Sequence, residues 1–159
     1  MKTNYLLFII LCTFLLSACT AGVNKDLMSG LKISNSGLSY KEAYLSRAQI
    51  RLNTSEYNLG DTVYLYIDGI EGYTEKEGKI NRGVSMLITD PEGIKTIDEI
   101  DLYASDESTG VSKEDATVTS LRLILLESFV AGKKYTWKSK IWDKNGKGEI
   151  TSEVEFTLK

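Results

Sequence analysis

Apolar and polar residues alternate with a period of two through most of the chain from residue 45 onward, and this pattern constrains the fold more than any other feature. Within residues 62–67, for example, Val63, Leu65 and Ile67 share one face. Such alternation is typical of half-buried β-strands, whereas a helix repeats its apolar residues every three to four positions. The sequence therefore predicts an all-β domain without a long helix.

The same alternation predicts about seven short strands separated by turns. The expected strands cover residues 48–52, 62–67, 84–89, 94–103, 117–126, 135–142 and 149–158. One intervening turn, Asp90-Pro91-Glu92-Gly93, has proline at its second and glycine at its fourth position, as a type I turn favours. Short strands with regular turns predict a single antiparallel β-sandwich over residues 45–159.

The last two predicted strands resemble the final F and G strands of immunoglobulin-like domains. The segment 131–137 places Tyr135 near the start of a strand, where those domains use a tyrosine to close the preceding corner. Trp137 stands where antibody domains have a cysteine, so the resemblance is to the disulfide-free members of the group. It implies an immunoglobulin-like sandwich. Strand alternation places Trp137 on the core face and Trp142 on the opposite, lysine-bearing face.

The first 19 residues resemble the leader of a bacterial lipoprotein. Lys2 precedes an apolar stretch over residues 5–16, whose length of about a dozen residues suits a signal peptide and is short of the ~20 that span a membrane. The stretch ends in Leu16-Ser17-Ala18-Cys19, which is similar to the lipobox of bacterial lipoproteins. This resemblance implies a signal peptide over residues 1–18 and a diacylglyceryl group on Cys19 that anchors the protein to the membrane.

The residues after the lipobox refine the expected location. Thr20 follows the cysteine in place of the aspartate that retains lipoproteins at the inner membrane of enteric bacteria. We therefore expect a lipid-anchored protein of the bacterial cell envelope, located at the outer membrane. Both the periplasmic and the external face of that membrane stay as alternatives. Residues 19–44 are small, polar and weakly patterned, and we expect them to form a lipidated flexible tether. A helical turn over residues 40–45 is too short to stand alone.

Composition excludes several classes of function. The chain has no histidine and only two cysteines, of which Cys12 leaves with the leader and Cys19 carries lipid. Zinc sites, Ser-His-Asp triads and Cys-His dyads are therefore excluded, and the mature domain forms no disulfide. A net charge of −3 with both signs interspersed does not suggest nucleic acid, which needs a basic stripe. We expect no enzymatic activity, cofactor or metal.

Strand direction places three loops, residues 68–83, 104–116 and 143–148, at one end of the predicted sandwich. Binding residues often lie on such clustered loops. The candidate binding residues are Tyr73, Arg82, Asp106, Trp142, Asp143 and Asn145. Asp143 and Asn145 could offer oxygens to calcium, but Lys147 occupies the position where an EF-hand loop needs an oxygen ligand. A hairpin turn is the better account, and calcium stays the alternative.

Two functions fit these observations. The first is a non-enzymatic module that binds another envelope protein, or assists its assembly, through the clustered loops. The second is a surface glycan-binding protein in which Trp142 and Tyr73 contact sugar rings. The first strand enters from the loop end, so in both cases the chain emerges toward the membrane beside the candidate site.

Overall fold

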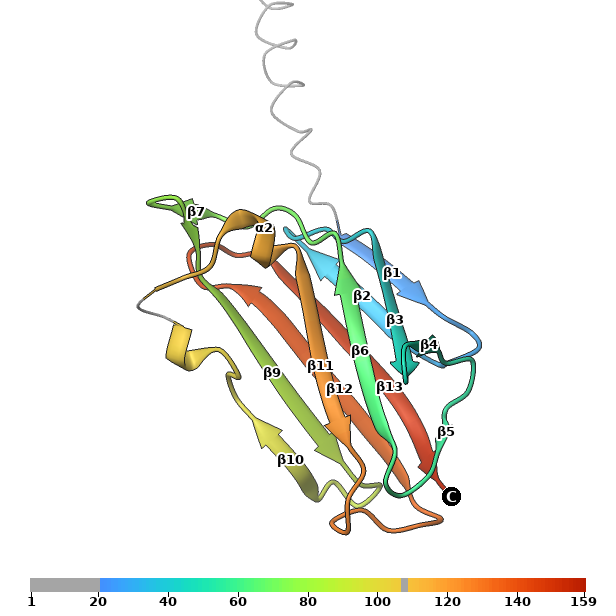
Figure 1. Ribbon diagram of the computed structural model, residues 1–159. Coiled ribbons are helices and arrows are strands. Elements are labelled where there is room, and N and C mark those ends of the chain that lie inside the picture. Colours follow the sequence, from blue (N-terminus) through green and yellow to red (C-terminus); the bar gives the residue numbers. More distant parts are fainter. Residues whose placement is uncertain (1–20, 107–108) are drawn as a thin grey trace, which may run out of the picture.

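Two sheets pack face to face around one apolar core in the computed structural model, which describes residues 21–106 and 109–159 (Figure 1). The larger sheet contains, in spatial order, β1 (Ala21–Lys25), β2 (Lys32–Ser36), β13 (Glu149–Leu158), β12 (Lys134–Asp143), β9 (Arg82–Thr89) and β10 (Lys95–Glu99), with β5 (Glu56–Tyr57) beside β13. The smaller sheet contains β11 (Val118–Ile124), β6 (Thr62–Asp68), β3 (Glu42–Arg47) and β4 (Ile50–Arg51).

Every pair of neighbouring strands is antiparallel except the short β5–β13 pair. The predicted fold class is confirmed in that the domain is an all-β, antiparallel β-sandwich. Three short elements lie outside the two sheets, namely the hairpin of β7 (Glu75–Lys76) and β8 (Lys79–Ile80), the 3-10 turn η2 (Ala104–Asp106) and the helical turn α2 (Lys113–Ala116).

The core consists of the side chains that the period-two pattern assigned to one face. Val63, Leu65 and Ile67 of β6 are buried, and the inward residues of β12 and β13 meet them from the larger sheet. Trp137 is 1% exposed and lies in this core, as the sequence predicted. Burial of large apolar side chains of this kind stabilises the fold by about 1.5–3 kcal/mol each.

Tyr135 closes the corner between β11 and β12, as the immunoglobulin resemblance implied. The Tyr135 hydroxyl accepts a hydrogen bond from the backbone N–H of Val130 over 2.8 Å. Its ring lies edge-on to Phe129, with a centroid distance of 5.0 Å, and stacks on Phe156 at 5.6 Å. One side chain therefore ties the connecting loop to the core.

The predicted tether over residues 19–44 is wrong for its described part. β1, β2 and the start of β3 occupy this segment, and β2 pairs with β13 while β3 pairs with β6. Small polar residues such as Ser34 and Ser36 lie on the outward face of a well-paired strand, so the apolar pattern stayed weak. The segment 40–45, considered too short for an independent helical turn, contains the first four residues of β3.

The first predicted strand, residues 48–52, is misplaced. Ala48 and Gln49 have φ angles of 48° and 66° and form the two-residue turn between β3 and β4. Two consecutive positive φ angles are typical of the type I′ hairpin turn, which usually carries asparagine and glycine. Because positions 48 and 49 contain neither asparagine nor glycine, the sequence did not indicate a turn there. Elsewhere the predicted turn at Asp90 is confirmed by a 3.0 Å hydrogen bond from Gly93 N–H to the Asp90 carbonyl.

The three predicted loops do gather at one end of the sandwich (Figure 1). Asp143 pairs with Arg82 at the end of β12, and Asp68 pairs with Val118 at the end of β6. Ile80 and Val111 form a bridge between the first two loops. The first residue of β1 lies at this end as well, because Ala21 pairs with Ser36 and Ser36 pairs with Glu149. The chain therefore enters the described domain beside the clustered loops, as predicted.

We expect the substitution Tyr135→Phe to lower the free energy of unfolding by about 1–3 kcal/mol, because the Val130 N–H loses its partner in a partly buried corner. Urea denaturation followed by tryptophan fluorescence measures this change. Tyr64→Phe is the control, since Tyr64 lies half-buried on the solvent side of β6, and its effect should stay within about 0.5 kcal/mol. Equal effects of the two substitutions would contradict the assigned role of Tyr135.

Candidate functional site

The outward face of the larger sheet carries a row of mostly short side chains that crosses five strands. Strand register aligns this row from β9 to β1 through Ser85, Lys140, Thr151, Ser34 and Val23. The row covers four strand spacings, which corresponds to about 19 Å. Three of its five side chains end in a hydroxyl close to the sheet.

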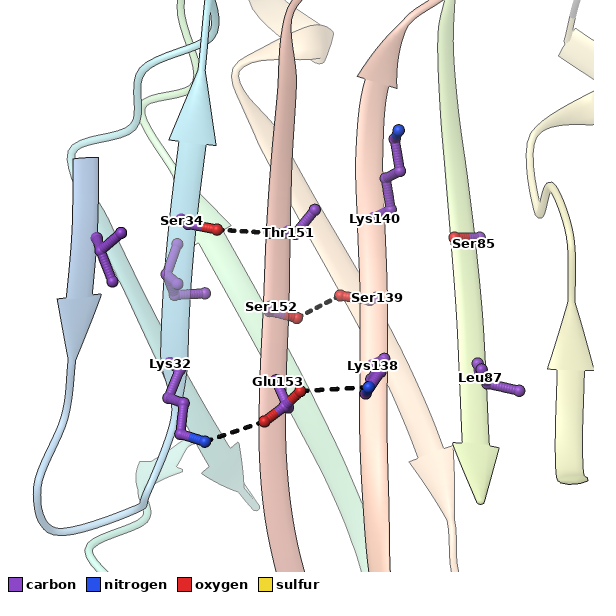
Figure 2. Close-up of a pocket in the computed structure, with 12 residues that line it drawn as sticks. Lys32, Ser34, Ser85, Leu87, Lys138, Ser139, Lys140, Thr151, Ser152 and Glu153 are labelled. Atoms are coloured by element: carbon purple, nitrogen blue, oxygen red, sulfur yellow. Dashed lines mark hydrogen bonds and ion pairs between the residues drawn. The ribbon is translucent and has the colours of Figure 1, made fainter. Parts of the chain in front are cut away.

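Longer side chains border this row on both sides. One neighbouring row contains Leu87, Lys138, Glu153 and Lys32, and the other contains Trp142 and Glu149. The face is therefore hollowed along the short side chains, with a volume of ≈ 520 Å³ (Figure 2). A second hollow of ≈ 530 Å³ adjoins it toward Trp142 and β10, and Ser85, Leu87 and Lys140 line both. We name the two hollows together the trough.

Ion pairs hold the wall of the trough formed by Lys138, Glu153 and Lys32 (Figure 2). The Glu153 carboxylate lies 3.0 Å from Lys32 Nζ and 3.4 Å from Lys138 Nζ. The hydrogen bond from Lys32 lowers the pKa of Glu153 and outweighs the opposing effect of its partial burial. The wall therefore holds the Glu153 carboxylate in its ionised form between two lysine side chains.

Hydroxyl groups form the floor of the trough. Ser34 Oγ and Thr151 Oγ1 lie 2.7 Å apart and share one hydrogen bond, so one O–H donor of the pair and acceptor lone pairs on both oxygens stay available to a ligand. Lys140 Nζ lies 2.5 Å from the Glu149 carboxylate. The trough thus presents hydroxyl, ammonium and carboxylate groups on an open surface.

Trp142 borders the second hollow and is half-buried. It pairs with Gly83 of β9, and a Cβ atom at Gly83 would overlap the indole ring. The ring therefore rests on the Gly83 backbone, which holds it in one orientation. Trp142 lies on the lysine-bearing face, as predicted from strand alternation.

Asp143 and Asn145, in contrast, form contacts within the loop end of the domain. Asp143 is 4% exposed, and its carboxylate accepts hydrogen bonds from the backbone N–H groups of Thr74 over 2.7 Å and Asn145 over 2.9 Å. The carboxylate therefore fixes the 68–83 loop to the turn between β12 and β13. The Asn145 side-chain nitrogen is buried.

Arg82 and Tyr73 also contact other parts of the loop end. Arg82 Nη1 donates a hydrogen bond of 2.7 Å to the Val118 carbonyl, and its guanidinium lies 4.8 Å from the centre of the Tyr103 ring. The Tyr73 hydroxyl is buried, and this burial raises its pKa to about 12. Asp106 ends η2, and its side chain lies outside the description, as does Cys19.

A further ion pair at this end gave no signal in the sequence. Lys144 Nζ lies 2.6 Å from the Asp101 carboxylate, and the two side chains are only 14% and 13% exposed. Asp101 also accepts hydrogen bonds from the N–H groups of Tyr103 and Val84. Burial alone would raise the pKa of Asp101, but the bonds from Lys144, Tyr103 and Val84 together lower it below 3.8.

The described residues, 21–106 and 109–159, contain neither a cluster of metal ligands nor a membrane-spanning helix. Within these ranges, no three acidic or cysteine side chains come close enough to hold a metal ion. The same ranges contain no helix that combines the length and apolar character required to cross a membrane.

Comparison with known proteins gives likenesses in structure only. No family model and no curated protein matches the chain. Among solved structures, the C-terminal domain of wzt is similar, with 9% sequence identity and a TM-score of 0.48 over 90% of this chain and 79% of that chain. This likeness concerns the fold alone.

We expect Asp101→Asn to destabilise the protein at pH 7 by ~1 kcal/mol, because the mutant loses a charged hydrogen-bond acceptor. Since the folded-state pKa of Asp101 is below 3.8, its contribution is present above about pH 4 and disappears as the pH falls through the folded-state value. Urea denaturation from pH 7 to pH 2 should show the two proteins converging. Glu77→Gln, in the exposed β7–β8 turn, is the control. A gap that is constant across this range would rule out a role for the charge.

Proposed function

We propose that this protein is a non-catalytic, lipid-anchored module of the bacterial cell envelope that binds a glycan in the trough. The observation that carries the proposal is the row of short hydroxyl side chains between two walls of longer ones. Sugars present many hydroxyl groups, which hydrogen-bond best to hydroxyl, ammonium and carboxylate groups of this kind. The row crosses the strands for about 19 Å, which suits a ligand of several linked rings better than a single sugar.

Trp142 supplies the apolar part of the proposed site. Sugar rings carry C–H faces that pack on aromatic rings, and a ring held against a glycine backbone loses little conformational entropy on binding. Tyr73 was the second aromatic residue in the glycan hypothesis, but its hydroxyl is buried and its ring packs against the core. The proposal therefore rests on Trp142 and the trough.

The alternative, an envelope protein bound at the loop end, has less support from the geometry. Asp143, Arg82 and Tyr73 contact other residues of this domain, so they offer few free groups to a partner. A protein interface of standard size also needs buried aromatic or aliphatic anchors, and most of the residues that line the trough are of polar type.

Substitutions in the trough test the proposed site. We expect Ser34→Tyr to fill the floor and to weaken glycan binding at least tenfold. Ser120→Tyr, on the exposed outward face of β11, is the matched control and should leave binding unchanged. The full chain, purified in detergent, is first screened on an array of bacterial envelope glycans, and the affinity for the best ligand is then measured by calorimetry. An array without any binding would contradict the proposal.

We expect Trp142→Ala to weaken binding of the same glycan about tenfold, which corresponds to ~1.4 kcal/mol and is at the upper end of aromatic contacts. Ile50→Ala, an exposed apolar residue on the smaller sheet, is the control. Calorimetry again gives the affinities. If Trp142→Ala bound like the unchanged protein, the indole would have no part in recognition.

The lipid anchor is tested separately. We expect Cys19→Ser to move the protein from the membrane fraction to the soluble fraction and to abolish labelling by a palmitate analogue. Cys12→Ser should retain both properties, because Cys12 lies within the predicted signal peptide. Membrane association and labelling that survive Cys19→Ser would show that the lipobox assignment is wrong.

A further inference from the structure

β1 forms an edge of the larger sheet and carries none of the features that usually protect an edge. Among residues 21–106 and 109–159 it pairs with β2 alone, so within this part of the chain its other side presents unpaired backbone donors and acceptors. Its sequence, Ala-Gly-Val-Asn-Lys, contains no proline and a single charge at its last position. Val23, at its centre, is 85% exposed. An edge of this kind is a template for another strand.

The other sheet edges are protected in different ways. β10 carries Lys95, Asp98 and Glu99, and its register with β9 shifts between Lys95 and Ile97. β11 has Arg122 at its centre, and the Arg82 guanidinium donates a hydrogen bond to the carbonyl of its first residue. β4 has only two residues. Charges, irregular register and short length all oppose pairing between molecules, so β1 is the open edge.

We propose that β1 pairs antiparallel with β1 of a second copy of this chain, about a two-fold axis through Val23. In this register Val23 meets its symmetry mate, Gly22 lies opposite Asn24, and Ala21 lies opposite Lys25. We call the line along which the two β1 strands meet the seam. The two copies of Lys25 are four residues apart along the seam, about 14 Å, which exceeds the Debye length of ~8 Å at physiological salt. The segment is therefore self-complementary, without like charges in contact.

This pairing also joins the two troughs. Val23 ends the row of short side chains on the outward face, and a two-fold axis normal to the sheet keeps both outward faces on the same side. The row therefore continues from Ser34 and Val23 of one copy into Val23 and Ser34 of the other. The joined row spans nine strand spacings, about 43 Å. The joined trough rests on the proposed glycan function, whereas the strand pairing does not.

Crosslinking through a cysteine at the seam tests the pairing without any glycan. Val23→Cys is introduced into the full chain, and native membranes are treated with a short bismaleimide. We expect a covalent dimer as the main product. Leu27→Cys is the matched control, because Leu27 is 84% exposed but lies in the turn beyond the seam, and it should stay monomeric. The unchanged chain, treated in parallel, reports any reaction through Cys12 or Cys19.

A measurement of mass completes the test. The soluble Cys19→Ser chain should have the mass of a dimer by light scattering, and addition of Val23→Asp should convert it into a monomer, because two carboxylates would then face each other. A monomeric Cys19→Ser chain, or equal crosslinking at Val23 and Leu27, would overturn the pairing. Dimers that bind no glycan would refute only the proposed function, and glycan binding by a monomer would refute only the pairing.

Discussion

The register of β12 is the constraint on which both the core and the candidate site depend. β12 is paired along most of its length with β13 on one side and β9 on the other. Its inward residues, among them Trp137 and Ile141, fill the core, and its outward residues Lys138, Lys140 and Trp142 line the trough. Because successive side chains of a strand alternate between faces, a slip by one residue would exchange the two sets. Packing of the core thus also fixes the positions of the groups that face a ligand.

Strands in which one face is strongly apolar could be predicted from the sequence. The alternation of β6, β11, β12 and β13 and the common end of the three loops were predictable from local pattern and strand direction. The corner role of Tyr135 was implied by the resemblance to immunoglobulin-like domains. β2 was missed because it has a single apolar residue, Ile33, among polar ones. β3 was missed because its apolar residues Ala43, Tyr44 and Leu45 are consecutive and do not alternate with polar residues. These strands gain their stability from pairing with β13 and β6, which are distant in the sequence. Tertiary pairing of this kind leaves little trace in local composition.

The candidate site was predicted only in part, for a related reason. Residues on turns, such as Asp143 and Arg82, attracted attention because charged loop residues often bind ligands. Here they connect loop to loop and so give the end of the sandwich its shape. Ser85, Thr151 and Ser34 carry no motif, and they become neighbours only when the order of the strands is known. Of the six residues selected from the sequence, Trp142 and Asp143 line the trough. The Asp143 carboxylate accepts hydrogen bonds within the loop end.

The early start of β1 limits the distance from the membrane that this domain can reach. A tether of 26 residues would have let the domain range widely above a membrane, but Ala21 already belongs to the larger sheet. If Cys19 carries lipid, only Cys19 and Thr20 separate the bilayer surface from that sheet, and they extend by at most ~7 Å. The domain would then sit directly on the headgroups, sampling a thin layer next to the membrane. Molecules whose chains leave the same surface would meet it far more often than molecules free in solution.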